Sequence, residues 1–308
     1  MGILTAMLIA QGGSANPAKT AAFSWTFQPH LSVWLALAFA GLGFAFIVKN
    51  LAATYSDQDP PVTARQKALM AAGLLCLVLA TTWPLSDLAT KYSLLARMGQ
   101  NLLVCLGAPG FFLAGIPRWL LRRLSAGDVA YRSIRAITRP SVAIVIFNVV
   151  IIGSQTPVVV SATTRSGGLH GLDGVLLFLS GCIMWAPALR VFPGSRPSGT
   201  AGRVGYLFFQ SLIPNFVSLV YIFARHPLYR DLATGARRLG LNPLTDQQLA
   251  GAMAKLVGVF VLWGSATFIL FRSSKAEEAG LDPEPLTWED VNRELRRLER
   301  KHRHVDHE

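Results

Sequence analysis

Charged residues are scarce in this chain. They make up 15% of its 308 residues, whereas 52% are hydrophobic, and the mean hydropathy is positive. A soluble globular domain usually carries about 25% charged residues. The composition therefore argues against a soluble protein and favours one embedded in a membrane.

Cysteine is also rare. Cys76, Cys105 and Cys182 fall in apolar stretches and have no Cys-x-x-Cys spacing, so the sequence offers neither a disulfide framework nor a zinc-ribbon pattern. We interpret them as small buried hydrophobic residues.

The sequence has no phosphate-binding loop, nucleotide fingerprint or nucleophile motif, and we expect no enzymatic activity and no bound cofactor. Acidic residues are outnumbered by basic ones, 17 to 29. The basic residues are not interleaved with aromatic ones as in nucleic-acid-binding modules, so no nucleic-acid partner is expected. The positive charge instead suits contact with anionic membrane lipids.

The sequence contains several long apolar runs. A helix that spans a bilayer needs roughly 20 mostly apolar residues. Seven stretches meet this length and predict an all-α bundle of seven transmembrane helices: 31–48, 67–84, 95–115, 141–157, 172–193, 204–224 and 249–271.

Lysine and arginine predict the orientation of the bundle, because loops rich in these residues stay in the cytoplasm. Most of them fall in the segments that share a side with the C-terminus, including 116–140 and the tail. The N-terminus is therefore predicted outside and the C-terminus inside, in a bacterial inner (plasma) membrane. We divide the chain into an extracytoplasmic arm at 1–25, a membrane domain at 26–273 and an amphipathic cytoplasmic tail helix at 274–308.

Polar residues inside the predicted spans are the candidate site. Arg97, Gln100 and Asn101 share one face of the third span, and a charge at the bilayer centre costs about 2.5 kcal/mol or more, so this face must meet other helices or water. The outer ends of the fifth and seventh spans carry further polar residues, which we expect to join the same cluster: His170, Asp173, Asp246, Gln247, Gln248 and Lys255.

The two carboxylates in this set are expected to neutralise its two cations, because charges inside a bundle are usually paired. Asp173 and Asp246 would then face Arg97 and Lys255. Two interpretations stay open at this point: a structural ion-pair network and a functional site.

Several motifs resemble one family. The segments WPLSDLA at 83–89, LGAPGFFLAGIP at 106–117, and RHPLYRDLA and LGLNPLTDQQLAG within 225–251 are similar to those of the multi-spanning CtaG-type cytochrome c oxidase assembly factors. The resemblance covers roughly 24–272. It implies a seven-span membrane protein of the respiratory chain that serves haem-copper oxidases, either by bringing copper to the binuclear centre or by holding a half-built subunit.

The chain departs from this family at the positions that would bind metal. The resemblance places histidines where Arg97 and Asn101 stand, and a His-x-x-Glu-His pattern where this chain reads His170-Gly171-Leu172-Asp173-Gly174. Copper(I) prefers two or more thioether, thiolate or imidazole ligands, and arginine keeps its positive charge. His170 alone remains as a metal ligand, and we expect the copper site to be lost.

The residues and the resemblance together support three candidate functions. The first is a membrane component of the haem-copper oxidase system that contacts oxidase subunits, either as an assembly scaffold or as a stably bound accessory subunit. The second is a copper chaperone that uses His170, in which case copper would be bound. The third is an ion or proton transporter, because ionisable residues inside spans often mark ion pathways.

Overall fold

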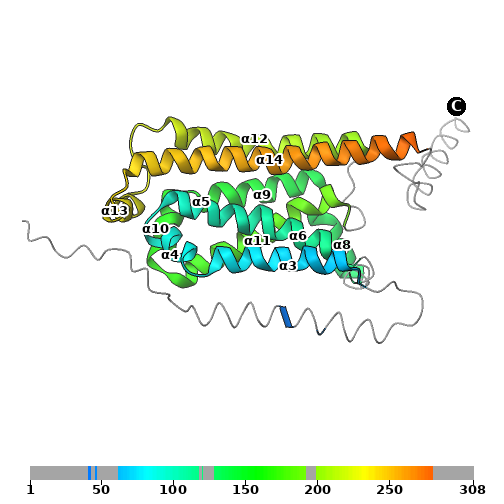
Figure 1. Cartoon of the computed structure of the whole chain (residues 1–308), viewed down its shortest axis with the longest axis horizontal. Helices are drawn as coiled ribbons and strands as arrows, with labels where there is room; N and C mark the ends of the chain where they lie inside the picture. The colour runs from blue at the N-terminus through cyan, green and yellow to red at the C-terminus, as the bar shows by residue number, and fades with distance from the viewer. Residues whose placement is uncertain are drawn as a thin grey trace, which may run out of the picture.

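A computed structural model describes residues 41–42, 46, 62–117, 120, 128–191 and 199–279. The predicted N-terminal arm, nearly all of the first predicted span and most of the predicted tail helix lie outside these residues. Every element assigned in the described part is helical, which agrees with the all-α prediction (Figure 1).

Twelve helical elements are assigned in the described residues. In chain order they are α3 Ala64–Thr81, α4 Leu85–Lys91, α5 Leu94–Leu102, the π-helical turn η1 Leu103–Gly107, α6 Ala108–Gly115, α8 Asp128–Ile137, α9 Pro140–Ser154, α10 Pro157–Arg165, α11 Gly167–Leu189, α12 Gly199–Phe223, α13 Arg230–Arg238 and α14 Pro243–Glu278.

Five helices in the described part are long and apolar enough to cross a membrane: α3, the continuous helix Leu94–Gly115, α11, α12 and α14. A sixth span results if Tyr131–Ile137 and Pro140–Ser154 are counted together, although they meet at a bend of 69°. The 15 residues of α9 give only about 22 Å of helix, less than the roughly 30 Å hydrocarbon core. The described residues therefore contain five or six candidate spans.

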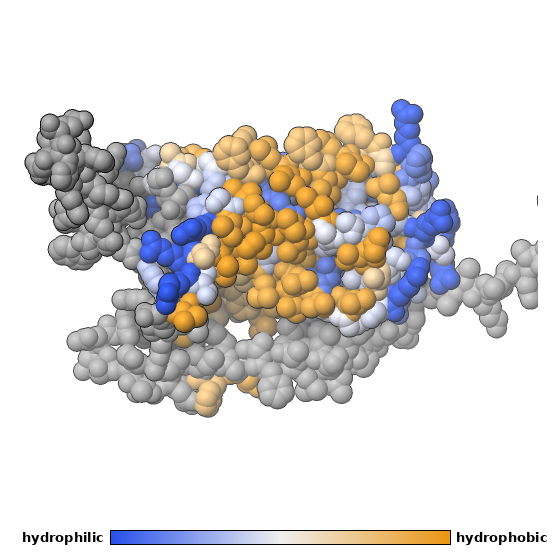
Figure 2. Space-filling model, turned by 180° about the vertical axis from the view of Figure 1, so that it is seen from behind, coloured by the Kyte–Doolittle hydropathy of each residue, from blue (hydrophilic) through white to orange (hydrophobic). Residues whose placement is uncertain are grey.

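The long helices lie side by side in a bundle, with α12 and α14 on one side and α3 on the other (Figure 1). Among the closest pairs, α12 packs along α14, α3 along α6, and α11 along α9. Figure 2 shows a band of hydrophobic residues across the middle of the surface, between hydrophilic ends. Large apolar side chains such as Phe260, 74% exposed, belong to this surface. A surface of this kind is suited to contact with lipid tails.

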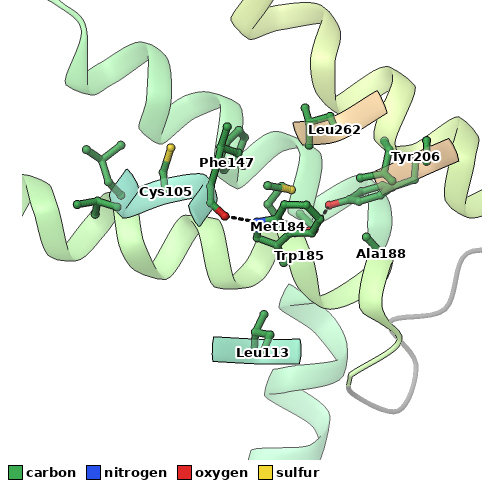
Figure 3. Close-up of a cluster of buried hydrophobic side chains, with 14 of the residues drawn as sticks. Cys105, Leu113, Phe147, Met184, Trp185, Ala188, Tyr206 and Leu262 are labelled. Atoms are coloured by element: carbon green, nitrogen blue, oxygen red, sulfur yellow. Dashed lines mark hydrogen bonds between the residues drawn. The ribbon is translucent and has the colours of Figure 1, made fainter. Parts of the chain in front are cut away.

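The core is built where α11 crosses the third span. Trp185 donates its indole N–H to the Leu106 carbonyl at 2.9 Å, and Tyr206 donates its hydroxyl to the Met184 carbonyl (Figure 3). Gly181 of α11 lies so close to η1 that a Cβ atom there would be 2.2 Å from the Cys105 carbonyl oxygen. The close approach therefore requires glycine.

The π-helical turn η1 ends two residues before Pro109. Pro109 has no backbone N–H with which to continue the helical hydrogen bonds, and just before it the N–H of Ala108 donates to the Leu103 carbonyl, five residues back. This wider turn inserts one extra residue into the third span.

The predicted spans and orientation leave three connections on the extracytoplasmic side, at 85–94, 158–171 and 225–248. The short helices α4, α10 and α13 lie at these connections, and α10 begins one residue earlier, at Pro157. These helices gather at one end of the bundle (Figure 1). At Gly235 of α13, a Cβ atom would lie 2.0 Å from the Lys91 carbonyl oxygen, so α13 packs directly on the end of α4. Together the short helices form a cap over this end of the bundle.

Candidate functional site

The polar face predicted for the third span is buried beneath this cap. Arg97, Gln100 and Asn101 all lie on α5 and are almost inaccessible to solvent. Ser93 begins the helix by accepting a hydrogen bond from the N–H of Ala96. None of these polar side chains faces lipid, as the cost of exposing them to hydrocarbon requires.

Arg97 forms the centre of the cluster and is 1% exposed. One of its terminal nitrogens, Nη2, donates to the Thr163 hydroxyl at 3.0 Å and lies 3.4 Å from Asp173 Oδ2. Thr163 belongs to α10 and Asp173 to α11, so a single guanidinium connects three helices. The predicted pairing of Arg97 with Asp173 is present.

Two other nitrogens of the same guanidinium, Nε and Nη1 of Arg97, are buried and have no hydrogen-bond partner among the described residues. Buried donors of this kind are normally satisfied by protein or water. Arg97 can therefore donate further hydrogen bonds, in addition to those that Thr163 and Asp173 accept.

Gln100 connects α5 to two further helices. Its amide nitrogen donates to the carbonyl of Ala80 in α3 at 2.8 Å and lies 3.3 Å from Nε2 of His170 in α11. His170 is half-buried. The structure thus places His170 beside an amide and next to the Arg97 and Asp173 pair.

Asp246 has a different role from the predicted one. Its carboxylate accepts hydrogen bonds from the Ser93 hydroxyl and from the backbone N–H of Leu94, both at 2.6 Å. A carboxylate at the N-terminus of a helix is stabilised by the unpaired N–H groups and the helix dipole. Asp246 therefore caps α5 and neutralises neither Arg97 nor Lys255, which corrects the expectation from sequence.

The remaining predicted cluster residues separate from the Arg97 centre. Gln247 accepts a hydrogen bond from the backbone N–H of Leu228 at 2.8 Å and thereby fixes the connection between α12 and α13. Gln248 and Lys255 are half-buried and form no hydrogen bond or ion pair with any residue in the described ranges. The expected carboxylate partner of Lys255 is thus not found there.

A tyrosine pair that the sequence did not predict completes this end of the bundle. The hydroxyls of Tyr221 and Tyr229 are 2.6 Å apart. Tyr229 donates to the backbone carbonyl of Gln155, so the single hydroxyl hydrogen of Tyr221 is shared between the Tyr229 hydroxyl and the side-chain carbonyl of Gln155, 3.1 Å away. Burial raises the pKa of Tyr229, although the Tyr221 hydroxyl and Arg97 oppose this shift, so Tyr229 remains a protonated donor.

The donor set around His170 does not fit a copper(I) site. His170 supplies one imidazole, and its nearest partner is the amide of Gln100. The thioether of Met98, which could in principle bind copper(I), packs in an apolar cluster that includes Leu94 and Tyr221. Within the described ranges no group of three or more His, Cys, Asp or Glu residues is arranged to hold a metal ion.

The bundle, its apolar belt and its capped polar cluster define a multi-pass helical membrane protein. Residues 42–276 match the profile of the cytochrome c oxidase caa3 assembly factor family (Caa3_CtaG). The match covers most of the chain, so the protein belongs to this family. Membership implies a role in the assembly of caa3-type cytochrome c oxidase. No curated protein and no solved structure is significantly similar to the chain.

Proposed function

We propose that this protein acts by contact with haem-copper oxidase subunits, as an assembly scaffold or a stably bound accessory subunit, and that it has lost the copper site of its family. In this proposal it binds rather than catalyses. It crosses the bacterial inner membrane seven times, with the N-terminus outside, the C-terminus in the cytoplasm and the cap of α4, α10 and α13 on the outer side.

The observation that supports the loss of copper is the buried pair of Arg97 and Asp173. A guanidinium keeps its charge. Among the described residues, Asp173 is the only one whose carboxylate forms an ion pair with Arg97. A copper cation beside His170 would be repelled by this fixed charge and would find one imidazole where two or more soft ligands are preferred. Arg97 thus supplies from within the protein the positive charge that a bound metal would bring.

The experiment is purification of the tagged full-length protein in mild detergent. We expect haem-copper oxidase subunits to co-purify, as identified by mass spectrometry and haem absorption spectra. Absence of oxidase subunits from the purified complex, with the protein itself intact, would contradict the contact proposal.

Copper is tested separately on the same purified protein. After anaerobic loading with copper(I) and removal of excess ion, we expect far less than one copper per chain. Stoichiometric copper that is lost in His170→Ala would instead establish the chaperone function. The variant Arg97→His, which restores an imidazole beside His170, is the matched comparison and should bind more copper than the unchanged protein.

A further inference from the structure

The short helix α8 lies at the end of the bundle opposite the cap (Figure 1). It meets α9 at a bend of 69°, and α9 packs along the long helix α11. Because of this bend, α8 runs across the direction of the long helices and does not extend α9 through the bilayer. A helix at this place lies near the boundary between the acyl chains and the headgroups of the lipid.

One side of α8 is apolar and is left open by the described part of the chain. Tyr131 and Ile134 are half-buried and form the side toward the bundle. Val129 and Ile137 lie on a different side, because each residue turns a helix by about 100°, and they are 72% and 41% exposed. These two side chains are therefore available to an apolar neighbour outside the bundle.

The lipid-facing surface of the bundle begins shortly after the bend. In α9, which starts at Pro140, Val145 and Val149 are 60% and 63% exposed and belong to the hydrophobic surface of the bundle. The open side of α8 thus precedes a helix that is suited to contact with lipid tails, and the same bilayer can cover both.

Arginines occupy a further side of α8. Arg132 and Arg135 are three residues apart and therefore share a face of the helix, and both are exposed. Arg139, at the bend, is exposed as well. The guanidinium of Arg135 lies 6.0 Å from the centre of the Tyr131 ring, which does not neutralise its charge. Within the described ranges neither Arg135 nor Arg139 forms an ion pair with a carboxylate.

An anionic phospholipid fits both features at once. A guanidinium binds a phosphate group through paired hydrogen bonds, and apolar side chains beside it enter the boundary of the acyl chains. An acidic protein in the aqueous phase would satisfy the arginines but would leave Val129 and Ile137 without an apolar neighbour. The segment 118–139 contains six arginines and one acidic residue, Asp128, so its charge is complementary to an anionic lipid surface.

We propose that α8 is an interfacial helix that binds anionic phospholipid, with lipid phosphates at Arg135 and Arg139. Val129 and Ile137 then lie against the acyl chains. The surface uses neither the Arg97 pair nor the cap, so it is independent of the copper question and of the oxidase contact. Only the leaflet rests on the proposed topology, which puts α8 at the cytoplasmic face, where anionic lipids attract basic segments.

The test measures which lipids surround α8 in the full-length protein. In a cysteine-free background, Val129→Cys carries a bimane fluorophore, and the protein is placed in phosphatidylcholine nanodiscs. These contain an equal minor fraction of brominated phosphatidylglycerol or of brominated phosphatidylcholine, whose bromine atoms quench a fluorophore on contact. We expect both lipids to quench and phosphatidylglycerol to quench more, because each arginine near the surface contributes about fivefold to the affinity for anionic lipid.

The arginines are tested by Arg135→Gln combined with Arg139→Gln. We expect this variant to lose most of the preference for phosphatidylglycerol, while quenching by phosphatidylcholine stays the same. Arg135→Lys with Arg139→Lys keeps both charges and should keep the preference. The matched control is Arg237→Gln with Arg238→Gln, which removes two exposed arginines from α13 at the other end of the bundle and should behave like the labelled parent protein.

Three results would overturn the proposal. Equal quenching by the two brominated lipids in the labelled parent would show that the arginines do not select anionic lipid. Absence of quenching by either lipid would show that Val129 faces water or another protein. The same loss of preference in the α13 control would trace the effect to the total charge of the protein and not to α8.

Discussion

Asp246 and Leu94 are joined by a hydrogen bond of 2.6 Å, from the backbone N–H at the start of α5 to a carboxylate at the start of α14. The same carboxylate accepts a hydrogen bond from Ser93. Two helices that are far apart in the chain, one beginning at Leu94 and the other at Pro243, therefore share one capping group. The start of the third span depends on the seventh predicted span.

Removal of this shared cap should destabilise the bundle. We expect Asp246→Ala to lower the free energy of unfolding by about 1–2 kcal/mol, because a helix cap and a buried hydrogen bond are lost together. Denaturant unfolding in detergent, followed by circular dichroism, measures this change. Gln248→Ala, two residues away and without a hydrogen bond in the described ranges, is the control and should change stability little.

The buried pair of Arg97 and Asp173 gives a second prediction. Arg97→Ala leaves a carboxylate buried without its counter-charge, and we expect a loss of about 3–5 kcal/mol in the free energy of unfolding. The double variant Arg97→Met with Asp173→Leu should recover much of this loss, because both charges are removed together. A double variant as unstable as Arg97→Ala would show that the pair is not the source of the effect.

An exposed ion pair at the same end of the bundle serves as the matched comparison. Arg165 lies 3.5 Å from Asp231, and its side chain is 73% exposed. Ion pairs that are exposed to water contribute about 0–1 kcal/mol to the free energy of unfolding. Arg165→Ala is therefore expected to leave stability nearly unchanged, and an effect as large as that of Arg97→Ala would contradict the role of burial.

Close packing of α11 against η1 makes Gly181 a sensitive position. In Gly181→Ala the new methyl group would collide with the Cys105 carbonyl and the Pro109 ring, and we expect a loss of about 1–3 kcal/mol from overpacking. Thermal unfolding of the purified protein measures the loss. Gly174→Ala in the same helix meets no neighbour and should be neutral or stabilising, because alanine favours a helix over glycine.

The proposed topology can be tested by chemical labelling. In a cysteine-free background, Arg238→Cys at the end of α13 and Lys275→Cys near the end of α14 place single thiols at exposed positions. A membrane-impermeant maleimide added to whole cells should label the first and not the second. The second should react only after the cells are opened. The reverse pattern would invert the orientation deduced from the basic loops.

The membrane helices and the buried face of α5 were predictable because each depends on local sequence. Apolar length predicts a span, and helical spacing places Arg97, Gln100 and Asn101 on one side. The partnership with Asp173 followed from the need to neutralise a buried charge. These features require only the periodicity of a helix and the cost of burying charge.

The partners of these polar residues and the short helices depend on contacts between segments that are distant in the sequence. Thr163 shares the Arg97 guanidinium, yet nothing near Thr163 in the sequence marks it as a partner. The sequence favours a cation as the partner of Asp246, because capping of α5 from another helix is visible only in three dimensions. The short helices α4, α10 and α13 have seven to nine residues each, too few for a clear periodic pattern. The polar residues were therefore easier to predict than their partners.

The π-helical turn at Leu103–Gly107 also affects how the third span can be compared or redesigned. Each residue advances an α-helix by about 100°, so an inserted residue rotates everything after it relative to everything before it. Helical spacing counted from Arg97 and Asn101 therefore does not predict which residues face inward after Ala108. A chimera that joins the first half of this helix to a relative's second half without the extra residue would rotate Pro109 by about 100° and out of its close contact with Gly181.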